Sequence, residues 1–100
     1  MERIKNLAKQ IEEELEDAEH YAKCAVKLKD ENASDSSAYA EMARQEMGHA
    51  EKLHNMAVRL IEKQRQTGIA PPAAMLAVWE WEHEKMMDHM ATVKLLLSMA

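Results

Sequence analysis

The chain of 100 residues carries 18 Asp and Glu against 13 Lys and Arg, and its formal net charge of −5 disfavours nucleic acid as a partner. This length suits one small domain, residues 1–100, whose modest core favours self-association. The single cysteine, Cys24, cannot form an internal disulfide and fits a reducing compartment. Charges interrupt every apolar run near the N-terminus, so we expect a soluble cytoplasmic protein with neither a signal peptide nor a membrane partner.

Helix-favouring residues dominate the composition, which includes only two Gly and two Pro. Two stretches break the helical pattern. Residues 30–37 are rich in Asn, Asp and Ser, and residues 67–72 contain Gly68, which suits the position after a helix, and two prolines that suit the start of the next. Both breaks are short, so successive helices should run antiparallel. The sequence therefore predicts an all-α fold of three long helices, at about residues 2–30, 35–66 and 72–98.

Residues spaced three and four apart form a predicted packing face on each helix. The face of the first helix comprises Ile4, Leu7, Ile11, Glu14, Ala18, Tyr21, Ala25 and Leu28. That of the second comprises Tyr39, Met42, Glu46, His49, Leu53, Met56 and Leu60. That of the third comprises Leu76, Trp79, His83, Met86, Met90, Val93 and Leu97. Four polar residues interrupt these faces: Glu14, Glu46, His49 and His83. Small residues that would let two helices approach closely flank the faces, namely Ala18, Ala22 and Ala25 on the first helix and Ala43, Ala50 and Ala57 on the second.

Three of the interrupting residues should meet at one height of the bundle. From the first break, Glu14 lies roughly 21–23 Å along its helix, and Glu46 and His49 lie roughly 18–23 Å along theirs. A buried carboxylate must be hydrogen-bonded, protonated, charge-paired or bound to a metal. Two carboxylates that converge with an imidazole repel one another, and a divalent cation relieves that repulsion. We therefore expect Glu14, Glu46 and His49 to be metal ligands.

The motif Glu46-x-x-His49 on an inward helix face resembles the metal-binding element of ferritin-like di-iron carboxylate proteins. Glu14, followed seven residues later by Tyr21, is similar to the first metal-binding helix of ferritins and rubrerythrins. A full ferritin has four main helices in one chain, whereas this chain has three. The likeness is therefore closest to the half-size ferritins, such as encapsulated ferritin, and it covers about residues 4–60.

The resemblance implies a ferritin-like helical hairpin plus a third long helix, which forms a four-helix bundle by dimerisation. It further implies a homo-oligomer built on a dimer, with a di-iron site at the dimer interface and manganese as the alternative metal. The implied activity is that of a ferroxidase or peroxidase-type oxidoreductase, which oxidises Fe(II) or reduces peroxide. Glu14, Glu46 and His49 would hold the metal, and Tyr21 would either support a ligand carboxylate or simply pack in the core.

His83 is a weaker candidate ligand. The spacing Glu80-x-x-His83 repeats the motif, but His83 lies only about 17–18 Å from the second break, whereas Glu46 and His49 lie about 25–30 Å from it. His89 matches that height but flanks the packing face. Three alternatives remain for His83: the third helix is not a simple antiparallel continuation, His83 belongs to a neighbouring chain's site, or it is a core histidine. The alternative function for the whole chain is a non-enzymatic helical oligomerisation or interaction module without metal, in which the buried polar residues set the register.

Overall fold

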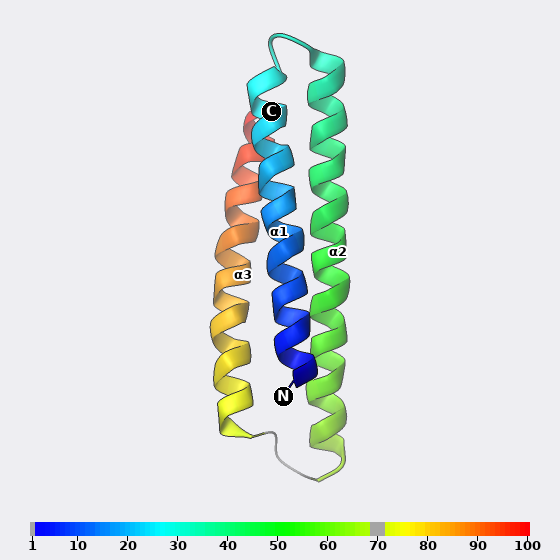
Figure 1. Ribbon diagram of the computed structural model, residues 1–100, viewed down its shortest axis with the longest axis vertical. Helices are drawn as coiled ribbons and strands as arrows, with labels where there is room; N and C mark the ends of the chain where they lie inside the picture. Colours follow the sequence, from blue (N-terminus) through cyan, green and yellow to red (C-terminus); the bar gives the residue numbers. More distant parts are fainter. Residues whose placement is uncertain (1, 69–71) are drawn as a thin grey trace.

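A computed structural model of the protein describes residues 2–68 and 72–100, and these ranges contain three helices and no strand. The helices are α1 (Glu2–Leu28), α2 (Ala33–Gln66) and α3 (Ala73–Met99). Figure 1 shows that successive helices run antiparallel and that α1 lies between the other two. The predicted all-α class is confirmed, and each observed helix end lies within two residues of its predicted position.

The first turn, residues 29–32, lies two residues nearer the N-terminus than predicted, and Asn32 caps α2. The Oδ1 atom of Asn32 accepts a hydrogen bond from the backbone N–H of Asp35 at 3.0 Å, which satisfies one free donor of the first helical turn. Ser36 lies within α2 and is buried, and its Oγ donates to the backbone carbonyl of Ala25 on α1 at 2.6 Å. The polar residues that predicted the break therefore cap one helix and join it to its neighbour.

The second break has the predicted helix-end residues in the predicted places. Gly68 has φ +79°, a left-handed conformation that glycine adopts without steric cost, and it follows the end of α2. Pro72 is the N-cap of α3, and its carbonyl accepts hydrogen bonds from the N–H groups of Met75 and Leu76. Residues 69–71 of the predicted break lie outside the described residues.

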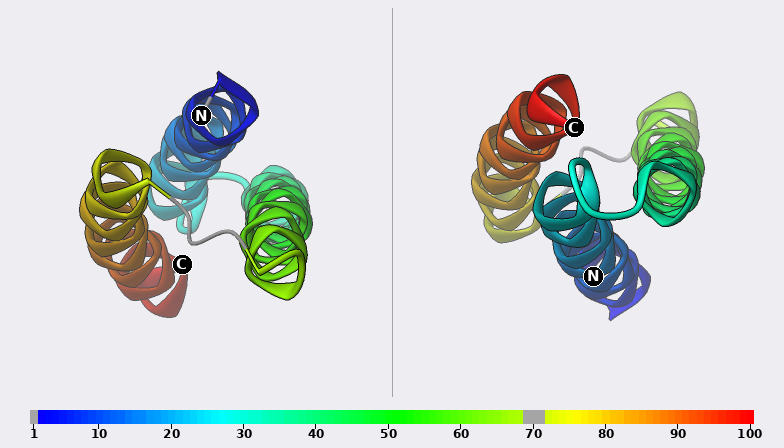
Figure 2. Two further views of the ribbon diagram at one scale, coloured as in Figure 1. Left: turned by 90° about the horizontal axis from the view of Figure 1, so that it is seen from below. Right: turned by 90° about the horizontal axis from the view of Figure 1, so that it is seen from above.

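Helix α1 is the centre of the core. Its buried side chains pack against both neighbours, whereas α2 and α3 contact each other far less. Figure 2, which looks along the bundle, shows α2 and α3 on two different sides of α1. The radius of gyration is 16.2 Å, compared with about 13 Å for a compact chain of this length, so the bundle is elongated. None of the described helices has an apolar stretch long enough to cross a membrane.

The buried row of α2 lies beside its predicted packing face. None of the seven predicted residues is buried, and Met42 and Met56 remain 38% and 37% exposed, while Leu53 and Leu60 pack partly buried against the core. Helix α1 packs instead against small side chains, since alanine lets two helix backbones approach closely. The buried residues of α2 are Ser36, Ala40, Ala43, Ala50, Ala57 and Ile61. The larger side chains are left along an edge of α2 beside α1, and the candidate site lies on that edge.

Candidate metal centre

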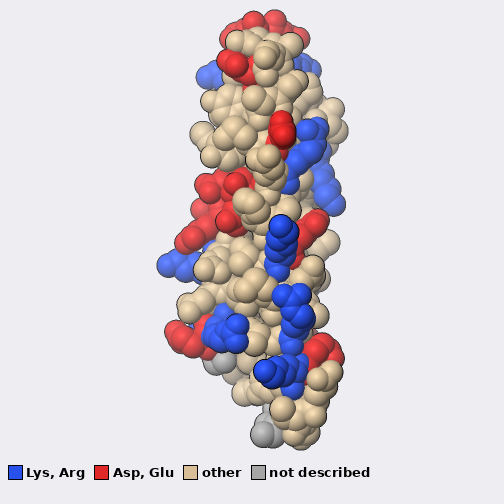
Figure 3. Space-filling model, turned by 90° about the vertical axis from the view of Figure 1, so that its right-hand side faces the viewer, with Lys and Arg blue, Asp and Glu red and all other residues tan. Residues whose placement is uncertain are grey.

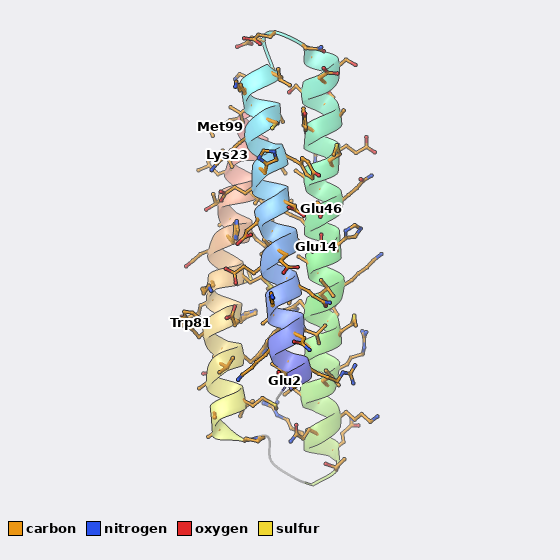
Figure 4. All side chains as sticks on the ribbon, viewed as in Figure 1. Glu2, Glu14, Lys23, Glu46, Trp81 and Met99 are labelled. Carbon is orange, nitrogen blue, oxygen red and sulfur yellow. The ribbon has the colours of Figure 1, made fainter. Side chains whose placement is uncertain are left out.

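The structure brings Glu14, Glu46 and His49 together. One ligand atom from each side chain lies within 4.8 Å of the other two. Among the described residues, no other group of three or more His, Cys, Asp or Glu side chains meets this condition. Glu14 comes from the middle of α1, and the other two lie one turn apart on α2. Figure 4 shows Glu14 and Glu46 in the gap between these helices at neighbouring heights. The convergence predicted from the helix rise is therefore present, and the role of the three residues as ligands stays a prediction.

The imidazole of His49 lies close to both carboxylates. Its Nδ1 atom lies 3.4 Å from Oε2 of Glu14 and 3.7 Å from Oε1 of Glu46. Both distances exceed those of well-formed N–H···O hydrogen bonds. The side chains of Glu14 and Glu46 are 28% and 22% exposed, whereas that of His49 is 54% exposed. The carboxylates are thus partly buried between α1 and α2, and the imidazole is the more exposed of the three groups.

One oxygen of the cluster has no hydrogen-bond donor. The Oε2 atom of Glu14 is buried and accepts no hydrogen bond from the described part of the chain. Buried polar atoms are nearly always satisfied, because an unsatisfied one loses the hydrogen bonds that water would have supplied. A cation bound between Glu14 and Glu46 would supply the missing interaction. The donor set of two carboxylates and one imidazole therefore fits a divalent ion such as Fe(II) or Mn(II).

The raised pKa of Glu46 also favours a bound cation. Its pKa is raised to about 7, first because its protonated form can donate a hydrogen bond to Glu14. Partial burial and the negative charge of Glu14 raise the pKa further, while the charge of His49 lowers it. Near neutral pH the ionised and protonated forms of Glu46 are therefore both populated. A cation that replaced the proton would remove the repulsion between the carboxylates.

Apolar side chains border the cluster along the same edge. Met42 and Met56 lie seven residues before and after His49 on α2, and both are partly exposed. Tyr21 of α1 stacks on Tyr39 of α2, with ring centroids 6.1 Å apart and planes inclined by 28°. The proposed support of a ligand carboxylate by the Tyr21 hydroxyl stays a prediction. The edge as a whole combines large apolar side chains with three metal-ligand types.

The outward side of α2 is different in character. Figure 3 views the molecule from the side of α2 and shows Lys and Arg side chains following the long axis. Lys52, Arg59 and Lys63 are exposed residues of this helix. Such a charged surface is well solvated and resists burial. Helix α2 therefore has an alanine row against α1, a basic outward side, and the partly apolar edge that holds the cluster.

The structure places His83 elsewhere. Its ring lies 5.2 Å from that of His54 and 6.1 Å from that of Trp79, between α2 and α3. Burial lowers the pKa of His54, and the positive charge of a protonated His83 lowers it further. His89 pairs instead with Glu19 of α1, at 3.3 Å between Nε2 and Oε1. Neither histidine of α3 belongs to the Glu14 cluster.

Sequence reasoning missed His54. It follows Leu53 of the predicted packing face, and the spacing Glu51-x-x-His54 repeats that of Glu46-x-x-His49 five residues later, which is the signal that could have found it. The likeness to half-size ferritins rests on Glu14, Tyr21 and the motif at residues 46–49. Comparison with protein-family models, with curated proteins and with solved structures finds no match to this chain.

Proposed function

We propose that this protein is a ferritin-like metal-binding protein that holds a di-iron centre between two copies of the chain and oxidises Fe(II) or reduces peroxide. The observation that carries the proposal is the meeting of Glu14, Glu46 and His49 within 4.8 Å on two adjacent helices. Each copy contributes half of a ligand set. Manganese is the alternative metal, because carboxylate-rich sites with few histidines suit both ions.

The charges and ligand number support two ions shared by two chains. Two copies related by a two-fold axis would place four carboxylates and two imidazoles around one centre. The four negative charges would balance those of two divalent cations. One chain alone offers two carboxylates and one imidazole, which leaves a single ion poorly surrounded and half open to water. The donor set is therefore more complete in a dimer than in a monomer.

The partly apolar surface around the cluster also favours burial of the cluster by a second copy of the chain. The edge of α2 that holds Glu46 and His49 carries Met42 and Met56 partly exposed, although large apolar side chains gain free energy when they leave water. Two such edges packed against each other would bury these methionines and enclose the polar cluster. A hairpin of α1 and α2 from each copy would then form a four-helix bundle, with α3 outside it.

Within the site each residue has a definite task. A bound di-iron centre would supply the redox chemistry itself. Glu14 and Glu46 would neutralise and position the ions, and the Glu46 carboxyl would give up its proton on binding because its pKa is raised to about 7. His49 would supply a nitrogen ligand from the exposed side of the cluster. The apolar edges of both copies would keep bulk water away from the centre.

The second candidate function is a metal-free helical interaction module. The observation that favours it is the position of His49, whose Nδ1 atom lies near both carboxylates. A protonated His49 would partly neutralise Glu14 and Glu46, so the three residues would then form a polar network that fixes how two copies align. Metal content separates this function from the first.

The test is the iron content of purified protein after anaerobic addition of Fe(II) and removal of free metal. We expect about one ion per chain in the wild type and almost none in the double variant Glu46→Ala, His49→Ala. The matched control is Glu41→Ala, since Glu41 is an exposed carboxylate on the same helix. Iron oxidation by O₂ or peroxide is then followed in the same three proteins. A wild type that retains no iron would exclude the di-iron proposal.

A further inference from the structure

We propose a second metal site, built from His54 of α2 and His83 of α3, that binds a divalent transition ion such as Zn(II) or Ni(II) and fastens α3 to α2. It is independent of the Glu14 cluster and uses none of its residues. The two imidazoles come from different helices, yet their ring centroids lie 5.2 Å apart with planes inclined by 33°. Trp79 lies against both rings, at 5.3 Å from His54 and 6.1 Å from His83.

The ring separation fits shared coordination. Around a tetrahedral ion with metal–nitrogen bonds of about 2.0 Å, the centres of two coordinating imidazole rings lie about 5 Å apart. The observed separation of 5.2 Å is close to this value. The inclination of the planes is also compatible, because an imidazole can rotate about its bond to the metal. Neutral imidazole is a preferred ligand of Zn(II), Cu(II) and Ni(II), which identifies the class of ion.

Both rings are available for coordination. His49 and His89 pair with carboxylates, whereas neither His54 nor His83 forms such a pair in the described ranges. Both side chains are partly buried, so their positions are restricted by their neighbours. Trp79 packs against the core and limits the freedom of both rings. Two imidazoles whose movement is already restricted lose less conformational entropy on binding an ion than free side chains would.

Carboxylates can complete the coordination. Glu51 lies three residues before His54, and Glu80 lies three residues before His83, so each glutamate shares a helix face with its histidine. Both glutamates are exposed, and neither forms an ion pair within the described part of the chain. Rotation of either side chain can bring an oxygen toward the two rings, and water can fill a remaining position. The site would then have two imidazoles and at least one carboxylate.

An ion at this position would change the behaviour of α3. Helices α2 and α3 contact each other much less than each contacts α1, so a bridge between them would strengthen the weakest of the three helix pairs. An ion that binds the folded chain better than the unfolded chain raises its stability by mass action. The ion would thus act as a structural clamp, and the reacting metals would remain at the Glu14 cluster.

The test is a Ni(II) titration followed by the fluorescence of Trp79. It uses the Trp81→Phe variant, because the chain has two tryptophans and Trp81 is 59% exposed. The substitutions Glu46→Gln and His49→Gln are added to remove the first cluster. We expect saturable quenching at one ion per chain and a higher melting temperature with Zn(II). Mg(II), which prefers oxygen ligands, should produce neither effect.

Substitution of the two histidines should abolish the response. His54→Gln or His83→Gln should weaken Ni(II) binding by at least about tenfold, the usual effect of disturbing even a residue that supports a ligand. His20→Gln is the matched control, since His20 is an exposed histidine of α1, and it should leave binding unchanged. If a histidine variant loses its helical circular dichroism, the exposed pair Glu51→Gln, Glu80→Gln replaces it and should also weaken binding. No quenching in the parent, or equal binding in the parent and all variants, would overturn the proposal.

Discussion

His49 and Glu14 lie on different helices, yet Nδ1 of His49 is 3.4 Å from Oε2 of Glu14, a buried oxygen that accepts no hydrogen bond from the described residues. The same nitrogen lies 3.7 Å from Glu46. One imidazole therefore lies near two carboxylates that repel each other and lack hydrogen-bond donors. A protonated His49 serves them as a cation, whereas a neutral His49 can join them in holding one. The two proposed functions differ in which of these states the native protein uses.

The first prediction concerns Glu46 and iron. We expect Glu46→Gln to lower the affinity for Fe(II) by more than about tenfold, because the amide keeps the shape of the side chain but loses the charged ligand oxygen. Glu41→Gln should leave the affinity within about twofold, since exposed charges away from the site act only through screened electrostatics. Anaerobic equilibrium dialysis with iron determination measures both. Equal losses in the two variants would indicate diffuse attraction of Fe(II) to an acidic chain.

The second prediction concerns the oligomer. We expect sedimentation equilibrium at micromolar concentration to show at least a dimer. Met42→Lys should weaken this dimer by about tenfold or more, because it places an unpaired charge in the partly apolar edge that a second copy would cover. The same change should alter the stability of the folded chain by less than about 0.5 kcal/mol, since Met42 is already 38% exposed in a single copy.

Leu95→Lys is the control for that experiment. Leu95 is 63% exposed on α3, which would lie outside the proposed four-helix bundle. We therefore expect Leu95→Lys to leave the dimer intact. Disruption by Leu95→Lys and not by Met42→Lys would move the interface to α3 and would leave the Glu14 cluster open to water. A monomer that binds two ions per chain would contradict a shared site.

The third prediction concerns Ser36, whose Oγ donates a buried 2.6 Å hydrogen bond to the carbonyl of Ala25. Ser36→Ala should destabilise the protein by about 1–3 kcal/mol, because the carbonyl loses its donor where water cannot replace it. Ser98 offers a matched comparison, since its Oγ makes a bond of the same length to the carbonyl of Leu95 at an exposed position. Ser98→Ala should cost less than about 0.5 kcal/mol. Urea unfolding followed by circular dichroism compares the two, and equal losses would show that burial is not the cause.

The helices could be predicted from sequence because the residues near each helix end determine where it begins or stops. Gly68 and Pro72 act through their own backbone conformations, so their roles follow from their identities. The packing face of α2 could not be predicted in the same way. That helix carries a row of large apolar residues and a row of alanines, and periodicity alone does not say which row meets α1. Close approach of the backbones favours the alanines, a property of the helix pair rather than of one helix.

The Glu14 cluster was predictable because the fixed rise per residue gives the position of each side chain along its helix, measured from the turn. Glu14 and Glu46 are 32 residues apart, but they are nearly equidistant from a short turn, so the turn places them side by side. The pairing of His54 with His83 was not found by this reasoning. It depends on how far α3 leans toward α2, and α1 lies between the two helices over most of their length.

The last prediction concerns pH and follows from the pKa of Glu46, which is raised from 4.5 to about 7 in the folded chain. Between these values the folded state holds a proton that the unfolded state has lost, so the contribution of Glu46 to stability is full below about pH 4.5 and is lost as the pH rises through about 7. His54 acts in the opposite sense, because its pKa is lowered and its stabilising effect is lost as the pH falls below its unfolded value. The difference between wild type and Glu46→Gln removes the effect of His54, which both proteins contain.

We therefore expect the unfolding free energy of metal-free wild type, minus that of Glu46→Gln, to fall steadily from pH 5 to pH 8. Urea unfolding in the presence of a chelator measures it at each pH. Above pH 7 the variant should be at least as stable as the wild type, since the amide cannot repel Glu14. At pH 7.5, added Mn(II) should raise the unfolding free energy of the wild type and leave that of Glu46→Gln unchanged. At pH 6.5, Mn(II) binding to the wild type should release protons. A difference that does not vary with pH would mean that Glu46 is ionised throughout and paired with His49, and the interaction module would then be the better account of the cluster.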